Sequence, residues 1–288
     1  MARIAALLQA GPTYSFEFFP PKTDEMERQL DKTIAELALL SPSFVSVTYG
    51  ALGSTRDRTR DVVMRINREQ AFPCMAHLTC VGHTRDDVAR LLDEYADAGV
   101  ENILALGGDP PADGSDPGGE YEYAFELVQT VRSHPAGFSI GVAAHPELHP
   151  RSSDRASDRR MLAEKLEAAD FGVTQFFFDA DDYFRMMDEL DALGCRTPVL
   201  PGIMPVITVA GVKRMAAMNG SLIPSAMLER LEAVEDDADA VVDIGVETAT
   251  ALCEQMIEAG APGLHLYALN RSTSVRRIYD ELGLTPTE

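Results

Sequence analysis

Eight short apolar runs, each followed by a longer amphipathic segment, constrain the fold of this chain more than any other feature of its sequence. A short apolar run is typical of a buried strand, and apolar residues at three- and four-residue spacing are typical of a helix. The expected strands cover residues 14–19, 44–48, 74–79, 102–106, 138–143, 172–177, 198–203 and 264–267. Strands that alternate with helices pair in parallel, so this α/β pattern predicts a single (βα)8 TIM barrel domain over residues 1–288.

The segments between these runs carry the spacing and the end signals of helices. Val88, Leu91, Leu92 and Tyr95 illustrate the spacing, and Gly99 follows them as a helix end signal. The expected helices cover residues 24–40, 56–67, 85–98, 121–133, 154–169, 181–193, 209–218, 225–231 and 236–259, and residues 1–10 are typical of a further short helix. A doubly wound open sheet is the alternative, but no Gly-x-Gly-x-x-Gly turn follows any strand.

The charge balance excludes several classes of partner. Lys and Arg number 25 against 46 Asp and Glu, which leaves a net charge of −21. Such an acidic surface repels nucleic acid and anionic membranes, and no apolar stretch reaches the length that spans a bilayer. The four cysteines lack CxxC spacing, so we expect reduced thiols in a cytoplasmic protein.

Unusual polar residues gather at the ends of seven of the expected strands. They are Glu17, Thr48, Tyr49, His77, Thr79, Asp109, His145, Glu147, His149, Gln175, Tyr267, Asn270 and Arg271. In parallel barrels the C-terminal strand ends meet at one mouth, where active sites lie. We therefore expect these side chains to form one site.

Glu17 is the strongest candidate for acid–base chemistry. It lies near the end of the first expected strand, between Phe16 and Phe18, and two prolines stop that strand shortly afterwards. A carboxyl group held among aromatic rings loses water, which predicts a raised pKa suited to proton donation. The alternative is a carboxylate satisfied by a buried ion pair.

His145, Glu147 and His149 offer a rival interpretation. Together with Asp109 or Glu17 they could bind one ion, as in a metal-dependent TIM-barrel hydrolase. The prolines that follow both histidines bend the chain and disfavour a shared face. We therefore expect no metal site and keep the hydrolase as the alternative function.

Eight collinear segments between residues 14 and 284 carry a more specific signal. They read SFEFFPPK at 15–22, FVSVTYGA at 44–51, HLTC at 77–80, GDPP at 108–111, AHPELHP at 144–150, TQFFFD at 174–179, PGIMPV at 201–206 and LNR at 269–271. In this order they resemble the methylenetetrahydrofolate reductase family. The resemblance implies a (βα)8 barrel that reduces 5,10-methylenetetrahydrofolate to 5-methyltetrahydrofolate, with NADH or NADPH supplying the hydride and FAD usually carrying it.

The resemblance also implies roles for five residues. Glu17 would protonate the departing nitrogen when the one-carbon bridge opens to an iminium ion. Asp109 would stabilise the developing positive charge, and Gln175 would hydrogen-bond the pterin. Tyr267 would line the same substrate site, and Arg271 would pair with the glutamate carboxylates of the folate.

The implied cofactor contacts are less complete. The matching cofactor positions are Thr48, His77, Asp109, Tyr123, Ala124, His145, His149, Asp158 and Lys165. Gly107 and Glu164 replace arginines of relatives, and Met161 replaces an asparagine. Each lost charge-assisted hydrogen bond costs roughly 1.5–3 kcal/mol, so we expect poor FAD binding and direct hydride transfer from the nicotinamide. No arginine cluster suits a 2′-phosphate, which favours NADH, and the resemblance leaves the oligomeric state open.

Overall fold

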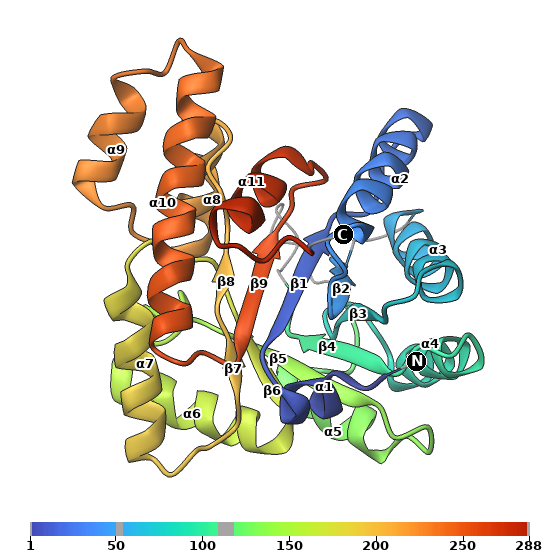
Figure 1. Ribbon diagram of the computed structural model, residues 1–288. Helices are drawn as coiled ribbons and strands as arrows, with labels where there is room; N and C mark the ends of the chain where they lie inside the picture. The colour runs from blue at the N-terminus through green and yellow to red at the C-terminus, as the bar shows by residue number, and fades with distance from the viewer. Residues whose placement is uncertain (1, 50–53, 109–117, 287–288) are drawn as a thin grey trace.

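The computed structural model describes residues 2–49, 54–108 and 118–286, and it shows parallel strands closed into a barrel inside a ring of helices (Figure 1). The strand order is β7-β6-β5-β4-β3-β2-β1-β9-β8. The strands are β1 (Thr13–Phe18), β2 (Phe44–Val47), β3 (Cys74–Thr79), β4 (Asn102–Leu106), β5 (Ser139–Ala144), β6 (Phe171–Thr174), β7 (Val199–Leu200), β8 (Gly202–Ile203) and β9 (Gly263–Tyr267). The expected (βα)8 barrel is confirmed.

The barrel closes through a strand that Pro201 divides into β7 and β8. Proline has no N–H to donate to a ladder, so the pairing changes partner at this residue. β7 pairs with β6 and β8 pairs with β9, which joins the two ends of the sheet. Gly202 is required at the junction, because a Cβ atom there would lie 2.3 Å from the Thr174 carbonyl oxygen.

The helices follow the strands in the expected order. They are α1 (Ile4–Ala10), α2 (Asp24–Ala38), α3 (Ser54–Glu69), α4 (Arg85–Asp97), α5 (Ala124–Ser133), α6 (Arg155–Ala168), α7 (Ala180–Ala192), α8 (Val209–Asn219), α9 (Ser225–Glu232), α10 (Ala238–Glu258) and α11 (Thr273–Glu281). Helix α11 was not expected. Its buried residues Val275, Ile278 and Tyr279 have helical spacing, but the segment is short and lies beyond the last apolar run.

Side-chain caps define several helix starts. Thr84 and Asp87 form a capping box at α4, and Asp154 accepts a hydrogen bond from the Ser157 N–H at α6. Among the described residues no helix is both long and apolar enough to cross a membrane.

The two faces of each strand pack into different environments. Phe16 and Phe18 point outward into the large core between the sheet and the helices. The lower interior of the barrel holds a separate apolar cluster, which Ile4 of α1 closes from the N-terminal end of the strands (Figure 1). The Ile4 N–H donates to the Asn102 side chain at 2.7 Å, which anchors this plug. Further buried polar residues, Glu17 among them, lie in the other half of the barrel interior, towards the C-terminal ends of the strands.

Candidate active site

Glu17 lies inside the barrel among polar groups from three neighbouring strands. Its Oε2 atom is 3.2 Å from His265 Nε2 on β9, 3.4 Å from His77 Nε2 on β3 and 3.4 Å from Ser46 Oγ on β2. Only 5% of the Glu17 residue is exposed. This corrects the expectation that Phe16 and Phe18 wall the carboxylate, because alternate residues of a strand face opposite sides.

The ring of His265 is held between two serines and Glu17. Its Nδ1 atom lies 2.7 Å from Ser15 Oγ, and the Ser15 hydroxyl also lies 3.2 Å from the Leu264 carbonyl oxygen. Its Nε2 atom lies 3.2 Å from Glu17 Oε2 and 3.3 Å from Ser46 Oγ. These contacts fix the orientation of the imidazole against the carboxyl group.

The pKa of Glu17 reflects these contacts. Burial by itself raises the pKa, but His77, His265 and Ser46 together hold it below the ordinary value of 4.5. The expected rise is therefore wrong for the substrate-free site. Burial lowers the pKa of His77 to about 4, so its ring is neutral at neutral pH.

Gln175 and Tyr267 share one wall of the barrel mouth. The Tyr267 hydroxyl donates to the Thr174 carbonyl oxygen at 2.9 Å and lies 3.4 Å from Gln175 Oε1. Gln175 follows β6 instead of lying within it, as had been expected, although its N–H still donates to the Ala144 carbonyl oxygen at 2.7 Å. Burial and the nearby Glu17 carboxylate raise the pKa of Tyr267 well above its ordinary value. The ring therefore carries a neutral hydroxyl group.

Arg271 lies at the rim on the turn after β9 and is exposed. Asp109, the remaining residue expected to touch substrate, lies outside the described residues.

A buried arginine organises the loop after β5. Arg159 is 2% exposed and donates to the carbonyl oxygens of His145 at 3.0 Å, Pro146 at 2.5 Å and Glu147 at 2.9 Å. It also pairs with Asp158 at 2.7 Å. Sequence patterns did not single out Arg159, because only the folded loop brings three carbonyl groups to one guanidinium.

The Asp158 carboxylate is itself fully engaged within the protein. It accepts hydrogen bonds from the Ser152 hydroxyl at 2.6 Å and from the His149 N–H at 3.3 Å, besides its pairing with Arg159. Burial lowers the pKa of Lys165 to about 8, an effect that Asp158 partly offsets. Of these two expected cofactor contacts, Lys165 is the one whose charged group makes no ion pair with a described residue.

The histidines of the same loop do not form a metal site with described residues. The His145 and His149 rings meet edge to face, with centroids 4.6 Å apart. Burial, followed by His149, Lys165 and Arg159, lowers the pKa of His145 to about 3. Glu147 turns away and accepts a hydrogen bond from the Leu222 N–H at 2.9 Å. No group of three or more His, Cys, Asp or Glu in the described part of the chain could hold an ion, so the hydrolase alternative is not supported.

The other expected cofactor positions lie around the same half of the mouth. Thr48 follows β2, and Tyr123 and Ala124 begin α5. Met161 is 56% exposed and Glu164 is exposed on α6, so neither is buried by the protein itself.

Arg151 occupies the space beside Gly107. A Cβ atom at Gly107 would lie 3.6 Å from Arg151 Nη2. A guanidinium group from the β5 loop therefore stands close to Gly107, the position where the family resemblance implies an arginine. The sequence pattern missed Arg151 because it is 44 residues further along the chain.

Comparisons with known proteins identify relatives over nearly the whole chain. The methylenetetrahydrofolate reductase family model matches residues 2–283. The chain is 37% identical over 282 residues to the 5,10-methylenetetrahydrofolate reductase of Salmonella typhimurium, covering 98% of this chain and 94% of that protein. It is 35% identical to methylenetetrahydrofolate reductase (NADH) 1 of Arabidopsis thaliana, covering 98% of this chain and 50% of the plant protein.

A solved structure shares the fold at low sequence identity. A Clostridium thermocellum protein described as binding two copies of 5-methyl-5,6,7,8-tetrahydrofolic acid superimposes with a TM-score of 0.66 at 15% identity, covering 97% of this chain and 96% of that one. The family model and the close relatives span the barrel from its N-terminal plug to α11, and the chain belongs to the methylenetetrahydrofolate reductase family.

Proposed function

We propose that this chain reduces 5,10-methylenetetrahydrofolate to 5-methyltetrahydrofolate with a hydride taken directly from a nicotinamide nucleotide, NADH in preference to NADPH. The observation that carries the proposal is the buried carboxyl–imidazole pair of Glu17 and His265 at the barrel mouth. The name of the Arabidopsis relative, which specifies NADH, supports the choice of nucleotide.

The reaction needs one proton and one hydride. Protonation of a bridge nitrogen lets its bond to the methylene carbon break, which leaves an iminium ion. The hydride then adds to that carbon and makes the methyl group, while the nicotinamide leaves oxidised. A single proton donor beside the bridge is therefore sufficient for the acid chemistry of the protein.

Glu17 is that donor. In the free enzyme the contacts of Glu17 hold its pKa below the ordinary value. A pteridine ring over the mouth excludes water, which disfavours the charged carboxylate and raises its pKa. Glu17 then holds a proton next to the substrate. Ser15 orients the His265 ring against the Glu17 carboxyl group.

Gln175, Tyr267 and Arg271 bind the folate. Gln175 presents an amide to the pterin edge, and its Oε1 atom accepts a hydrogen bond from the Phe176 N–H at 3.2 Å, while Tyr267 lines the same wall. Arg271 pairs with the glutamate carboxylate of the substrate, because a guanidinium group suits bidentate recognition. Asp109 is assigned to stabilise the iminium ion, on the family resemblance alone.

The residues around α6 fit a flavin poorly. A flavin diphosphate would meet the exposed carboxylate of Glu164, and the carboxylate of Asp158 is already engaged by Ser152 and Arg159. Arg151 stands beside Gly107, and Lys165 of α6 makes no ion pair with a described residue. We assign them to the diphosphate of the nicotinamide nucleotide, and we route no step through FAD.

The test is an NADH oxidation assay on protein purified without added flavin, run with and without methylenetetrahydrofolate. We expect substrate-dependent oxidation by protein that shows no flavin absorbance in the visible spectrum. A preparation with stoichiometric bound FAD, or activity that appears only when FAD is added, would overturn direct transfer. No oxidation under either condition would overturn the reaction itself.

A further inference from the structure

The turn that follows β9 has an unusual backbone conformation. Leu269 and Asn270 have φ values of 51° and 54°, in the left-handed region that is rare for residues other than glycine. Residues in this conformation persist where the surrounding contacts hold them, and such positions cluster at functional sites. The turn lies between Tyr267, on the wall of the barrel mouth, and Arg271, at its rim. Its conformation therefore sets where the Arg271 side chain leaves the backbone.

The Asn270 side chain holds this turn to the end of β1. Its Nδ2 atom donates to the Phe19 carbonyl oxygen and its Oδ1 atom accepts from the Phe19 N–H, both at 2.9 Å. Phe19 lies one residue beyond β1, and the next two residues, Pro20 and Pro21, have no N–H to donate. One amide group therefore satisfies both backbone groups of Phe19, as a neighbouring strand would. We call this pair of hydrogen bonds the amide clamp.

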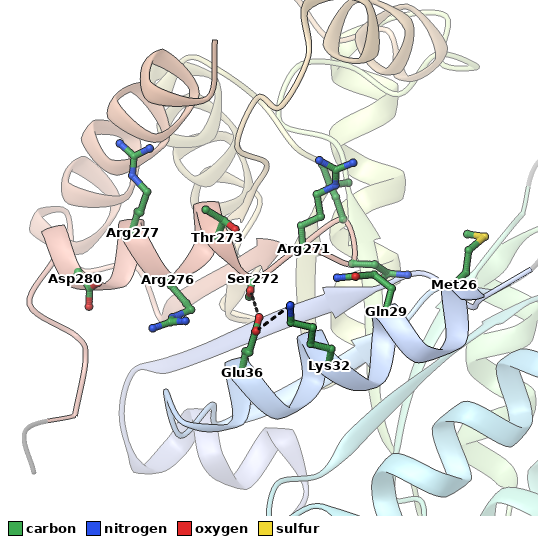
Figure 2. A pocket seen from close by; sticks show the side chains of 12 residues that line it. Met26, Gln29, Lys32, Glu36, Arg271, Ser272, Thr273, Arg276, Arg277 and Asp280 are labelled. Carbon is green, nitrogen blue, oxygen red and sulfur yellow. Dashed lines mark hydrogen bonds and ion pairs between the residues drawn. The ribbon is translucent and has the colours of Figure 1, made fainter. Parts of the chain in front are cut away.

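The same turn is also bonded to α2. The Thr33 hydroxyl, which is fully buried, donates to the Asn270 carbonyl oxygen at 3.0 Å. The Ser272 hydroxyl donates to Glu36, and Figure 2 shows this contact with Arg271 extending from the same turn. The residues on either side of Arg271 are therefore both held to α2, while its guanidinium group reaches the rim.

Backbone hydrogen bonds connect the turn to the proton donor. The Ala268 N–H donates to the Glu17 carbonyl oxygen at 3.1 Å. The carbonyl oxygen of the next residue, Phe18, accepts from the Thr48 N–H of the neighbouring chain segment at 2.9 Å. The turn after β9 thus holds the end of β1 at Glu17 and again at Phe19. A change in the turn would therefore shift the backbone that carries the Glu17 carboxyl group.

We propose that Asn270 is a positioning residue, whose amide clamp sets the position of Glu17 relative to Arg271. The inference rests on the proposed function, in which Glu17 protonates the one-carbon bridge and Arg271 binds the glutamate of the folate. These two groups meet different ends of the substrate, so their separation decides whether a bound folate places its bridge nitrogen beside the carboxyl group. A misplacement of about 1 Å can cost about 100-fold in rate. Asn270 acts through these two residues.

Asn270→Asp is the sharpest test of the clamp. Aspartate keeps the shape of the side chain and tolerates a left-handed backbone, but it replaces the Nδ2 donor by an oxygen that faces the Phe19 carbonyl oxygen. We expect kcat/KM for methylenetetrahydrofolate to fall about ten- to hundredfold, while the KM for NADH changes by less than about twofold. Steady-state NADH oxidation, with each substrate varied in turn, measures both constants.

Asn102→Asp is the matched control at the other end of the barrel. The Asn102 amide also bonds both ways to a short stretch of backbone, accepting from the Ile4 N–H at 2.7 Å and donating to the Ala2 carbonyl oxygen at 3.1 Å. This variant should lower the urea midpoint of unfolding, as Asn270→Asp does, because each loses a buried or partly buried hydrogen bond. It should leave kcat/KM for methylenetetrahydrofolate within about twofold of the wild type.

A double-mutant cycle with Arg271→Gln tests whether Asn270 acts through Arg271. In the Arg271→Gln protein, Asn270→Asp should lower kcat/KM for methylenetetrahydrofolate much less than it does in the wild type, because the two residues serve one contact. Additive losses would overturn the inference, and so would an equal loss of kcat/KM in Asn102→Asp. If Asn270→Asp does not fold, Asn270→Gly, which accepts the left-handed backbone without the clamp, enters the same comparison.

Failure of the proposed function has a different signature. A folded wild-type protein that does not reduce methylenetetrahydrofolate would overturn the proposed reaction and, with it, this role of Asn270. An active wild type whose kcat/KM is unchanged by both Asn270 variants would overturn the positioning role alone.

Discussion

The proton-donor side and the nucleotide side of the barrel mouth are built in different ways. Glu17, His77 and His265 are buried and come from strands whose register fixes their separation. Arg151 and Lys165 come from a loop and a helix and keep part of their surface exposed. The groups on the strands lie at hydrogen-bonding distance from one another, so their positions are fixed by the sheet. The two partly exposed cations have more freedom to follow a ligand. Substitutions should therefore have large effects on the first side and small effects on the second.

The largest effect is expected at Glu17. Glu17→Gln keeps the size and the hydrogen-bonding capacity of the side chain but removes the transferable proton. We expect kcat to fall about 10³-fold, the range of a lost general acid, while the KM for folate changes little. Steady-state NADH oxidation measures both. Glu147→Gln is the control carboxylate at the same mouth, and it should retain near wild-type kcat. Equal kcat values for Glu17→Gln and the wild type would remove Glu17 from the chemistry.

Arg159 tests whether the loop after β5, which carries Arg151, depends on one buried guanidinium group for its stability. Arg159→Met leaves Asp158 and three loop carbonyl groups without their shared partner, so the free energy of unfolding should fall by about 3–5 kcal/mol. Arg159 also pairs with Glu189 at 2.7 Å, and Arg155 pairs with the same carboxylate at 3.4 Å but is much more exposed. Arg155→Met should therefore cost less than ~1 kcal/mol. Urea unfolding compares the two variants, and equal losses would show that the loop does not depend on Arg159.

The pH dependence of the free energy of unfolding tests whether His77 is buried as a neutral ring inside the barrel. Its folded pKa of about 4 lies below the unfolded value of about 6.5, so the unfolded chain binds an extra proton between these values. This contribution to stability is complete above pH ~6.5 and is lost progressively as the pH falls, by about 2 kcal/mol at pH ~5. His77→Gln should reduce the difference in unfolding free energy between pH 7 and 5 by this amount. The low pKa of Glu17 affects stability only at more acidic pH. A variant with the wild-type pH dependence would contradict a neutral buried His77.

The smallest effect is expected at Arg151. Arg151→Gln removes one exposed cation beside Gly107, so the KM for NADH should rise about three- to fivefold with kcat unchanged. Arg160→Gln, an exposed arginine on α6, serves as the control and should leave the KM unaltered. A kcat loss comparable to that of Glu17→Gln would abolish the contrast between the two sides.

Local patterns predicted most of the architecture but not the environment of single side chains. Capped, amphipathic segments such as α4 were located to within a residue or two, because their signals lie within the helix itself. α11 was missed because a nine-residue helix offers only two turns of apolar spacing. The pKa of Glu17 was predicted in the wrong direction, because flanking phenylalanines are neighbours in sequence but face the other side of the strand.

By itself, the sequence determined the alternation of strands and helices, the end of the barrel that carries polar residues, and the family. These properties depend on residues a few positions apart, where backbone geometry alone decides which side chains share a face. Only the tertiary structure decided that Glu17 meets His265, 248 residues further along, and that Arg151 stands beside Gly107. The direct pairing of β1 with β9 brings the first and last strands together, and the contacts across it help to hold the pKa of Glu17 below its ordinary value.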